Sequence, residues 1–386
     1  MSLAFGYGFR VFFLSAAAYA ALIVAGWMGV LIFAWPLAGR LPMAWHAHEM
    51  IYGVVAAAIA GFLLTAVPNW TGTDRIHGRT LFALWLLWLS GRAGYWLADP
   101  AAGGPTAGLA MVLDLAFLPA LAIAVAVPIV RSGNRRNLIV VALLSALFAT
   151  NLWHHSLALT RPADTLALDM ITLLMIVIGG RITPAFTRNW MMHNGVDASR
   201  VVSNRWLELA SIALVVVLAA AAAAGAPDPW LAVLAIGAGL CNLARLAQWQ
   251  GWRTLRDPLV WVLHLGYAWI GIALLLRGIG AVMPSIPDAA WLHAIGVGAM
   301  GTLILGVMAR VSLGHTGRPL APPRTATAIF ALITLAAVAR VGTAAAWLPR
   351  SPALEIAAAA WIAAFVHFLF LYLPILLAPR ADGKPG

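Results

Sequence analysis

The chain has 386 residues, of which 63% are hydrophobic and only 10% are charged. Soluble domains carry about 25% charged residues, so this composition excludes a soluble globular protein. The formal net charge is +11, but the arginines lie mostly in short loops between apolar runs, a pattern typical of membrane proteins and not of nucleic-acid binders.

Apolar runs long enough to cross a bilayer recur along the whole chain. In chain order they predict twelve transmembrane helices, at residues 11–33, 45–67, 80–98, 107–130, 138–160, 166–186, 207–225, 230–249, 259–279, 291–311, 325–348 and 353–378. Short connections with Pro, Gly and Asp separate these runs. We therefore expect one all-α polytopic membrane domain over residues 1–386, in contact with the lipid bilayer.

The loop arginines indicate how the predicted helices cross the membrane. The N-terminal segment and the even-numbered loops hold most of them, including Arg10, Arg75, Arg131 and Arg188. Positive charge concentrates on the cytoplasmic side of membrane proteins. Both chain termini are therefore expected to be cytoplasmic, and the second span is expected to begin at the outer face.

The second predicted span opens with residues 45–50, which include His46, His48 and Glu49. Ionisable residues in a membrane are costly and are usually functional. Imidazole is also the commonest protein ligand for metal ions. His46 and His48 point about 200° apart around a helix, so one helix can serve two sites, or one histidine can bind a metal while the other faces the interface.

The predicted orientation places further ionisable residues at the same outer level. They are His154 and His155 in the fifth span, Asp169 and His293 at the starts of the sixth and tenth, and Arg92, Asp114, Arg340 and Glu355 in the third, fourth, eleventh and twelfth. Because lone charges that face lipid are costly, we expect these side chains to converge inside the bundle and to pair.

The cytoplasmic half of the predicted bundle holds a different set of polar residues. Glu208 is expected to pair there with Arg245 or Arg181. His264 lies in the same half, whereas His367 is nearer mid-depth. A single histidine on an apolar helix is more often a hydrogen-bonded core residue than a metal ligand, and both interpretations stay open for His367.

An internal repeat relates the second and tenth spans at an offset of 245 positions. His48, Gly53 and Gly61 are matched by His293, Gly298 and Gly306, and Arg92 of the third span is matched by Arg340 of the eleventh. The middle spans fit more weakly, with Glu49 aligned to Asp169. The pattern predicts three units of four helices, residues 1–137, 138–258 and 259–386. Shared helix-packing glycines are the alternative explanation.

The repeat places His48 and His293 at equivalent depths. Two imidazoles on opposed helices can supply both axial positions of a haem, which would be b-type here. Arg92 and Arg340 can bind haem propionates, because a guanidinium group matches a carboxylate. Interfacial anchoring of the histidines, and pairing of the arginines with nearby acidic residues, are the alternatives.

Residues 45–50, followed by residues 61–72, resemble the NnrS family, and so do residues 264–269 and 313–318. The resemblance covers essentially the whole chain. It implies a protein of the bacterial inner membrane that contains haem and copper and is linked to nitric oxide metabolism and protection from nitrosative stress. The motif positions that it carries over are His46, His48, Glu49, His264, His293 and His315.

The architecture is also similar to the catalytic subunit of haem-copper oxidases, which holds a low-spin haem between helices 2 and 10. The chain departs from that pattern because its seventh span has no histidine pair to complete an oxidase-type copper site. A proton-coupled secondary transporter is the second interpretation, since repeats and buried Arg, Asp and His suit that class. A third is an assembly factor without a redox centre.

Overall fold

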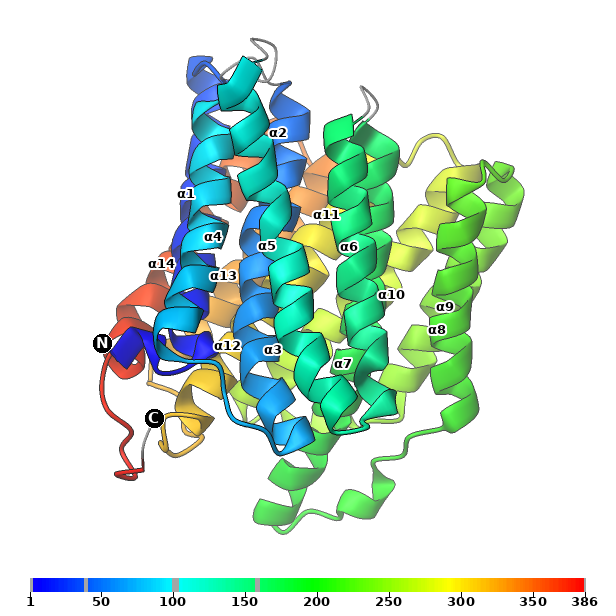
Figure 1. The fold of residues 1–386 in the computed structure, drawn as a ribbon. Helices are drawn as coiled ribbons and strands as arrows, with labels where there is room; N and C mark the ends of the chain where they lie inside the picture. The colour runs from blue at the N-terminus through cyan, green and yellow to red at the C-terminus, as the bar shows by residue number, and fades with distance from the viewer. Residues whose placement is uncertain (1–2, 38–40, 99–103, 157–159, 385–386) are drawn as a thin grey trace. The chain divides into compact units, whose positions relative to one another are not determined.

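The computed structural model describes residues 3–37, 41–98, 104–156 and 160–384, and within these ranges it is helical with no strand. The all-α prediction is therefore confirmed. Ten of the helices are α1 (Gly8–Phe33), α4 (Gly78–Leu97), α5 (Gly104–Arg131), α6 (Leu138–Ser156), α7 (Thr160–His193), α8 (Arg205–Ala223), α9 (Asp228–Ala247), α10 (Pro258–Val282), α13 (Ala326–Ala344) and α14 (Arg350–Leu376) (Figure 1).

Two further rods are each built from three consecutive segments. The first contains α2 (Pro42–His48), a π-helical segment η2 (Glu49–Val55) and α3 (Ala56–Thr71). The second contains α11 (Asp288–His293), a π-helical segment η6 (Ala294–Gly301) and α12 (Thr302–Gly314). These rods coincide with the second and tenth predicted spans.

Among the described residues, eleven helical segments are long and apolar enough to cross a membrane, so the chain is a polytopic membrane protein. The third predicted span, α4, is not one of them. Its 20 residues include Arg79 and Arg92 besides three Trp and one Tyr, which lower its hydropathy. The number of twelve spans and the cytoplasmic position of the termini therefore stay predictions.

The helix ends follow the chemistry of individual residues. The side chain of Asn204 accepts hydrogen bonds from the first turn of α8, and Asp257 does the same for α10. Both are favoured N-cap residues, because their side chains satisfy backbone N–H groups that the helix leaves unpaired. Gly72 ends α3 in the left-handed conformation, with φ of 66°, which glycine adopts without steric cost.

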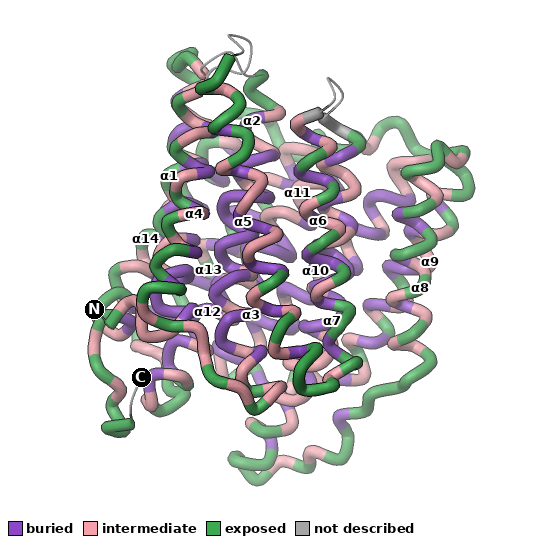
Figure 2. Tube along the Cα trace, viewed as in Figure 1, coloured by how far each residue is buried: buried purple, intermediate pink, exposed green. Residues whose placement is uncertain are grey.

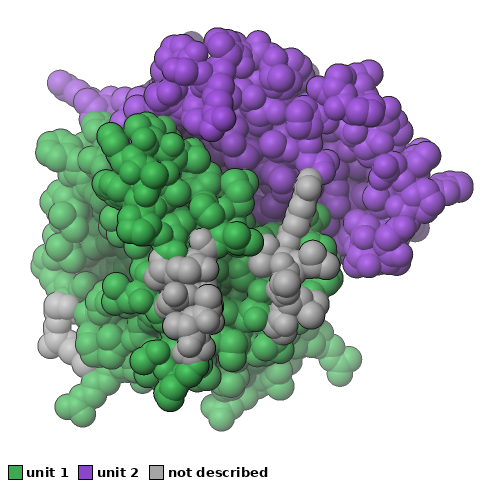
Figure 3. Space-filling view, turned by 90° about the horizontal axis from the view of Figure 1, so that it is seen from above, with its two compact units in different colours: residues 1–167, 310–321, 365–386 green, residues 168–309, 322–364 purple. Residues whose placement is uncertain are grey.

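The chain divides into two compact units (Figure 3). Unit 1 comprises residues 1–167, 310–321 and 365–386, and unit 2 comprises residues 168–309 and 322–364. In unit 1, α3 packs against α1 and α5, and α5 packs against α4 and α6. In unit 2, α10 packs against α9, α11 and η6. Buried residues run along α3 and α10 (Figure 2), so each unit has its own core.

The two π-helical segments occupy matching places in the sequence. Glu49–Val55 follows His48 directly, and Ala294–Gly301 follows His293 directly, so their starts are 245 positions apart. π-Helical turns are rare in proteins, and those that occur are often found at functional sites. The shared position supports the predicted relation between the second and tenth spans, whereas the boundaries of the three four-helix repeats stay a prediction.

Each π-helical segment contains a glycine against which an aromatic ring packs. A Cβ at Gly53 would lie 2.5 Å from the Tyr19 ring in unit 1, and a Cβ at Gly298 would lie 2.5 Å from the Trp269 ring in unit 2. Real Cβ atoms do not approach other heavy atoms so closely. The absence of a side chain at Gly53 and Gly298 therefore allows α1 and α10 to contact the π-helical turns.

Gly298→Ala should destabilise the protein by about 1–3 kcal/mol, because the new methyl group overlaps the Trp269 ring. Gly296→Ala is the matched control, since it lies in the same π-helical segment and, apart from the local helix itself, no described atom lies within 4 Å of its Cβ position. The measurement is the free energy of unfolding of the purified protein in detergent. Equal stability of the two variants would contradict this account of the packing.

Candidate functional site

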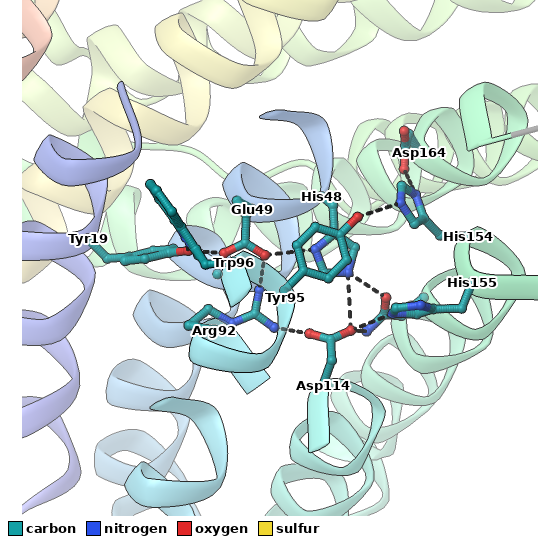
Figure 4. A network of polar contacts seen from close by, with 12 residues as sticks. Tyr19, His48, Glu49, Arg92, Tyr95, Trp96, Asp114, His154, His155 and Asp164 are labelled. Carbon is teal, nitrogen blue, oxygen red and sulfur yellow. Dashed lines mark hydrogen bonds and ion pairs between the residues drawn. The ribbon is translucent and has the colours of Figure 1, made fainter. Parts of the chain in front are cut away.

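Charged side chains from several helices of unit 1 meet at one buried point (Figure 4). His48 ends α2 and Glu49 begins η2, while Arg92 comes from α4, Asp114 from α5 and His155 from α6. His48 and Glu49 are fully buried, and Asp114 and Arg92 are only 2% and 4% exposed. The expectation that ionisable groups converge inside the bundle is met by these residues.

Arg92 joins the two buried carboxylates. Its Nη1 donates a hydrogen bond to Glu49 Oε1 at 2.5 Å, and its Nη2 donates to Asp114. Ionised carboxylates have a high desolvation cost and need close positive charge. One guanidinium group therefore faces two acidic side chains, and the cluster lacks one positive charge or one proton.

His48 lies between the same two carboxylates. Its Nδ1 is 2.9 Å from Glu49 Oε1, and its Nε2 is 3.1 Å from Asp114 Oδ2. A neutral imidazole has one N–H group, so in either tautomer one ring nitrogen presents a lone pair to a carboxylate oxygen. Two lone pairs at this distance repel each other unless a proton or a metal ion lies between them.

Three side chains of the cluster lie close enough together to hold a metal ion. One nitrogen each from His48 and His155 and one oxygen of Asp114 lie within 4.8 Å of one another. His155 Nε2 is 2.8 Å from Asp114 Oδ2. Two imidazoles and a carboxylate form a donor set that suits copper, zinc or iron. The contact of His48 Nδ1 with Glu49 matches the carboxylate partner that usually orients a metal-binding histidine.

Aromatic and polar residues fix the orientation of the His48 ring. The Tyr95 ring stacks on it, with a centroid distance of 3.7 Å and an angle of 5° between the planes. Tyr95 Oη lies 3.1 Å from His154 Nε2, and His154 Nδ1 lies 2.8 Å from Asp164 Oδ1. His154 is therefore part of the network one step away from His48, and not one of the three grouped ligands.

A second chain of hydrogen bonds holds Glu49 from the side of α1. The Trp96 indole N–H donates to Tyr19 Oη at 2.7 Å, and the Tyr19 hydroxyl donates to Glu49. On the other side, Asn151 Nδ2 donates to Asp114 Oδ2 at 3.0 Å. These contacts limit the movement of both carboxylates.

The sequence reasoning missed Tyr19, Tyr95 and Asn151. A signal was available for two of them, because residues three or four apart on a helix share a face. Asn151 precedes His155 by four residues, and Tyr95 follows Arg92 by three. Tyr19 lies on a different helix and has no such signal.

Other predicted residues of unit 1 lie outside this network. His46 stacks on Trp27 with a centroid distance of 4.6 Å, in agreement with the prediction that it points away from His48. His367 stacks on Phe370. His315 packs against Phe9, where burial and the charge of Arg380 lower its pKa.

The remaining predicted residues belong to unit 2. The predicted pair of Glu208 and Arg245 is present, with 3.6 Å between the charged atoms. Asp169 pairs with Arg277 at 2.5 Å, a partner that the sequence reasoning missed. His264 Nε2 lies 2.8 Å from the Thr187 hydroxyl, and His293 Nδ1 lies 2.7 Å from the Ala289 carbonyl. Arg340 on α13 is half-buried, and Glu355 on α14 is exposed.

Comparison with known proteins supports the resemblance seen in the sequence. The profile of one protein family, described as NnrS protein, matches residues 4–380. The match therefore covers nearly the whole chain and includes all helices of both units. A comparison with curated proteins gave no match.

Arg92→Gln should destabilise the protein by about 3–5 kcal/mol, because it leaves two buried carboxylates without their shared cation. The control is Arg200→Gln, which removes an exposed pair with Asp197 and should leave stability unchanged. The midpoint of thermal unfolding in detergent measures both effects. If Arg92→Gln unfolded at the wild-type temperature, the buried charge cluster would not be a structural element of unit 1.

Proposed function

The chain belongs to the NnrS family, and we propose that it is a metal-binding protein of the bacterial inner membrane that acts in the response to nitric oxide. In this proposal a copper ion is held by His48, Asp114 and His155. The observation that supports it is the grouping of three ligand atoms within 4.8 Å, beside a buried cluster that lacks one positive charge. Copper and nitric oxide enter through the family resemblance.

The neighbouring residues would position the metal ligands. If Nδ1 of His48 donates its hydrogen to Glu49, the lone pair of Nε2 is directed at the site, where it would bind the metal ion. Arg92 holds the carboxylates of Glu49 and Asp114 in place through separate nitrogens of one rigid guanidinium group. Bound copper would supply one-electron chemistry and a coordination position for a small gas.

The chain from Tyr95 to Asp164 would connect the buried cluster to the protein surface. Tyr95 stacks on His48 and contacts His154, and His154 contacts Asp164. The Asp164 side chain is 13% exposed, whereas His154 is buried. In this arrangement His154 can pass a proton between Asp164 and the Tyr95 hydroxyl, because an imidazole ring donates from one nitrogen and accepts at the other.

The haem that the resemblance implies is a further part of the proposal. His293 Nδ1 lies 2.7 Å from the Ala289 carbonyl, so Nδ1 carries the proton and Nε2 is the nitrogen that can bind iron. Axial ligation by His48 would require Nε2 to leave Asp114, and Arg92 is already paired with two acids. The axial pair His48–His293 and the propionate role of Arg340 stay predictions.

His155→Gln should reduce copper binding from one ion per chain to a small fraction of that, because it removes one of three ligands. Glu49→Gln should weaken copper binding by about 10–100-fold through its effect on the orientation of His48. The measurement is copper content and affinity of the purified protein after loading. The control is His193→Ala, an exposed histidine of α7, which should bind copper as the wild type does.

Copper content that stays at the wild-type value in His155→Gln would reject the proposed ligand set. Copper-free wild-type protein after loading would reject the copper proposal as a whole. The thermal unfolding midpoint of each variant separates loss of a ligand from loss of the fold.

His293→Ala should abolish the Soret absorption band of the purified protein, because it removes a predicted axial ligand. The same measurement on His48→Ala shows whether His48 is the second axial ligand of the haem. Loss of the band in both variants would support the axial pair, whereas loss in His293→Ala alone would leave His48 to copper. A band of wild-type intensity in His293→Ala would contradict the haem assignment.

A further inference from the structure

A fourth side chain, that of Asn151, reaches the same buried point as the three grouped ligands. Asn151 lies on α6 and is only 1% exposed. It precedes His155 by four residues, so the two side chains share one face of the helix. The helix that supplies one proposed ligand therefore also brings a carboxamide group to the site.

The hydrogen-bond network fixes the orientation of the Asn151 amide group. Its Nδ2 donates to Asp114 Oδ2 at 3.0 Å, while Asp114 Oδ1 accepts from Arg92. An ionised carboxylate only accepts hydrogen bonds, so the amide nitrogen must be the atom that faces Asp114. Reversal of the amide would bring two acceptor oxygens together. Oδ1 of Asn151 is therefore left to face His48.

That oxygen contacts the proposed metal-binding nitrogen of His48. Asn151 Oδ1 lies 3.1 Å from His48 Nε2, and Asp114 Oδ2 lies 3.1 Å from the same nitrogen. An imidazole nitrogen has a single in-plane direction for a hydrogen or a metal ion. Both contacts have hydrogen-bond geometry at this nitrogen, so a metal ion bound to Nε2 would lie beside both oxygen atoms.

The distances among these atoms are those of neighbouring ligands on one metal ion. Nitrogen and oxygen ligands lie about 2.1 Å from zinc and comparable ions, so two of them are about 3.0 Å apart at a right angle and about 3.4 Å apart at a tetrahedral angle. The observed separations are 3.1 Å for Asn151 and His48, 3.1 Å for His48 and Asp114, and 2.8 Å for His155 and Asp114. They agree with right angles, which suit copper(II) better than zinc.

We propose that Asn151 Oδ1 is a fourth ligand of the copper ion, which completes a set of two imidazole nitrogens and two oxygens. The inference rests on the proposed copper site and adds a residue to it. Tetragonal sets of nitrogen and oxygen are typical of copper(II), whereas copper(I) prefers sulfur. The carboxamide oxygen would therefore stabilise the oxidised ion. Because it is neutral, it adds no charge to a cluster that already holds two acids.

The test is pulsed electron paramagnetic resonance of the copper(II)-loaded full-length protein in detergent, with asparagine labelled by carbon-13 at its side-chain carbonyl. That carbon is bonded to Oδ1, so ligation of copper by Oδ1 should give a carbon-13 hyperfine coupling in the wild type. The coupling should be lost in Asn151→Leu, which has a similar volume and no donor atom. The matched control is Asn242→Leu, which removes an amide buried in unit 2 and should leave the coupling unchanged.

Two further measurements separate ligation from orientation of Asp114. Copper affinity should fall by about 10–100-fold in Asn151→Leu. Asn151→Asp keeps an oxygen donor but loses the N–H donor, and it should bind copper at least as tightly as the wild type. A residue that only oriented Asp114 would make both variants weak binders, which would contradict ligation. The copper(II)/copper(I) potential should rise in Asn151→Leu, because the oxidised ion loses an oxygen ligand.

A wild type that binds copper through two imidazoles but shows no carbon-13 coupling would overturn the inference and leave the copper site intact. A coupling that persists in Asn151→Leu would overturn it as well. A wild type that binds no copper would reject the site and this ligand together. The measurement on the wild type needs no substitution, so it decides the assignment even where a variant fails to fold.

Discussion

The ion pairs of Arg92 with Glu49 and Asp114 are the interaction on which the organisation of unit 1 depends. They tie the rod of α2, η2 and α3 to α4 and α5 through side chains that are buried. Because two acids share one guanidinium group, the cluster lacks one proton or one further cation, and His48 and His155 lie where a metal ion could bind. The same charge imbalance therefore accounts for the buried network and for its proposed affinity for a metal ion.

Polar chemistry in unit 1 is concentrated near the two ends of one rod. The metal cluster lies where α2 meets the π-helical segment, and a cavity with a polar lining that includes Asp74 and Arg75 lies at the end of α3. Between them α3 is apolar and largely buried. A metal cation bound at the cluster would offset its excess negative charge.

Much of this site could be predicted from the sequence, because charged residues are rare in membrane spans and their depth follows from the order of the spans. From that argument the sequence predicts one common depth in the membrane for four residues that the structure brings together, His48, Arg92, Asp114 and His155. Asn151 and Tyr95 were missed because an uncharged polar residue costs less to bury than a charged one, so its presence in a span does not by itself indicate a site. The π-helical turn at Glu49 has no signal in the sequence, because six of its seven residues are buried and no separate apolar face reveals the change in hydrogen-bond register.

The central claim is that His48 and His155 bind the same copper ion with Asp114. The most direct measurement is pulsed electron paramagnetic resonance of the copper(II)-loaded wild-type protein, which counts the imidazole groups bound to the metal. The account predicts two imidazole nitrogens and oxygen coordination without sulfur. A spectrum with no imidazole, or with sulfur ligands, would contradict it.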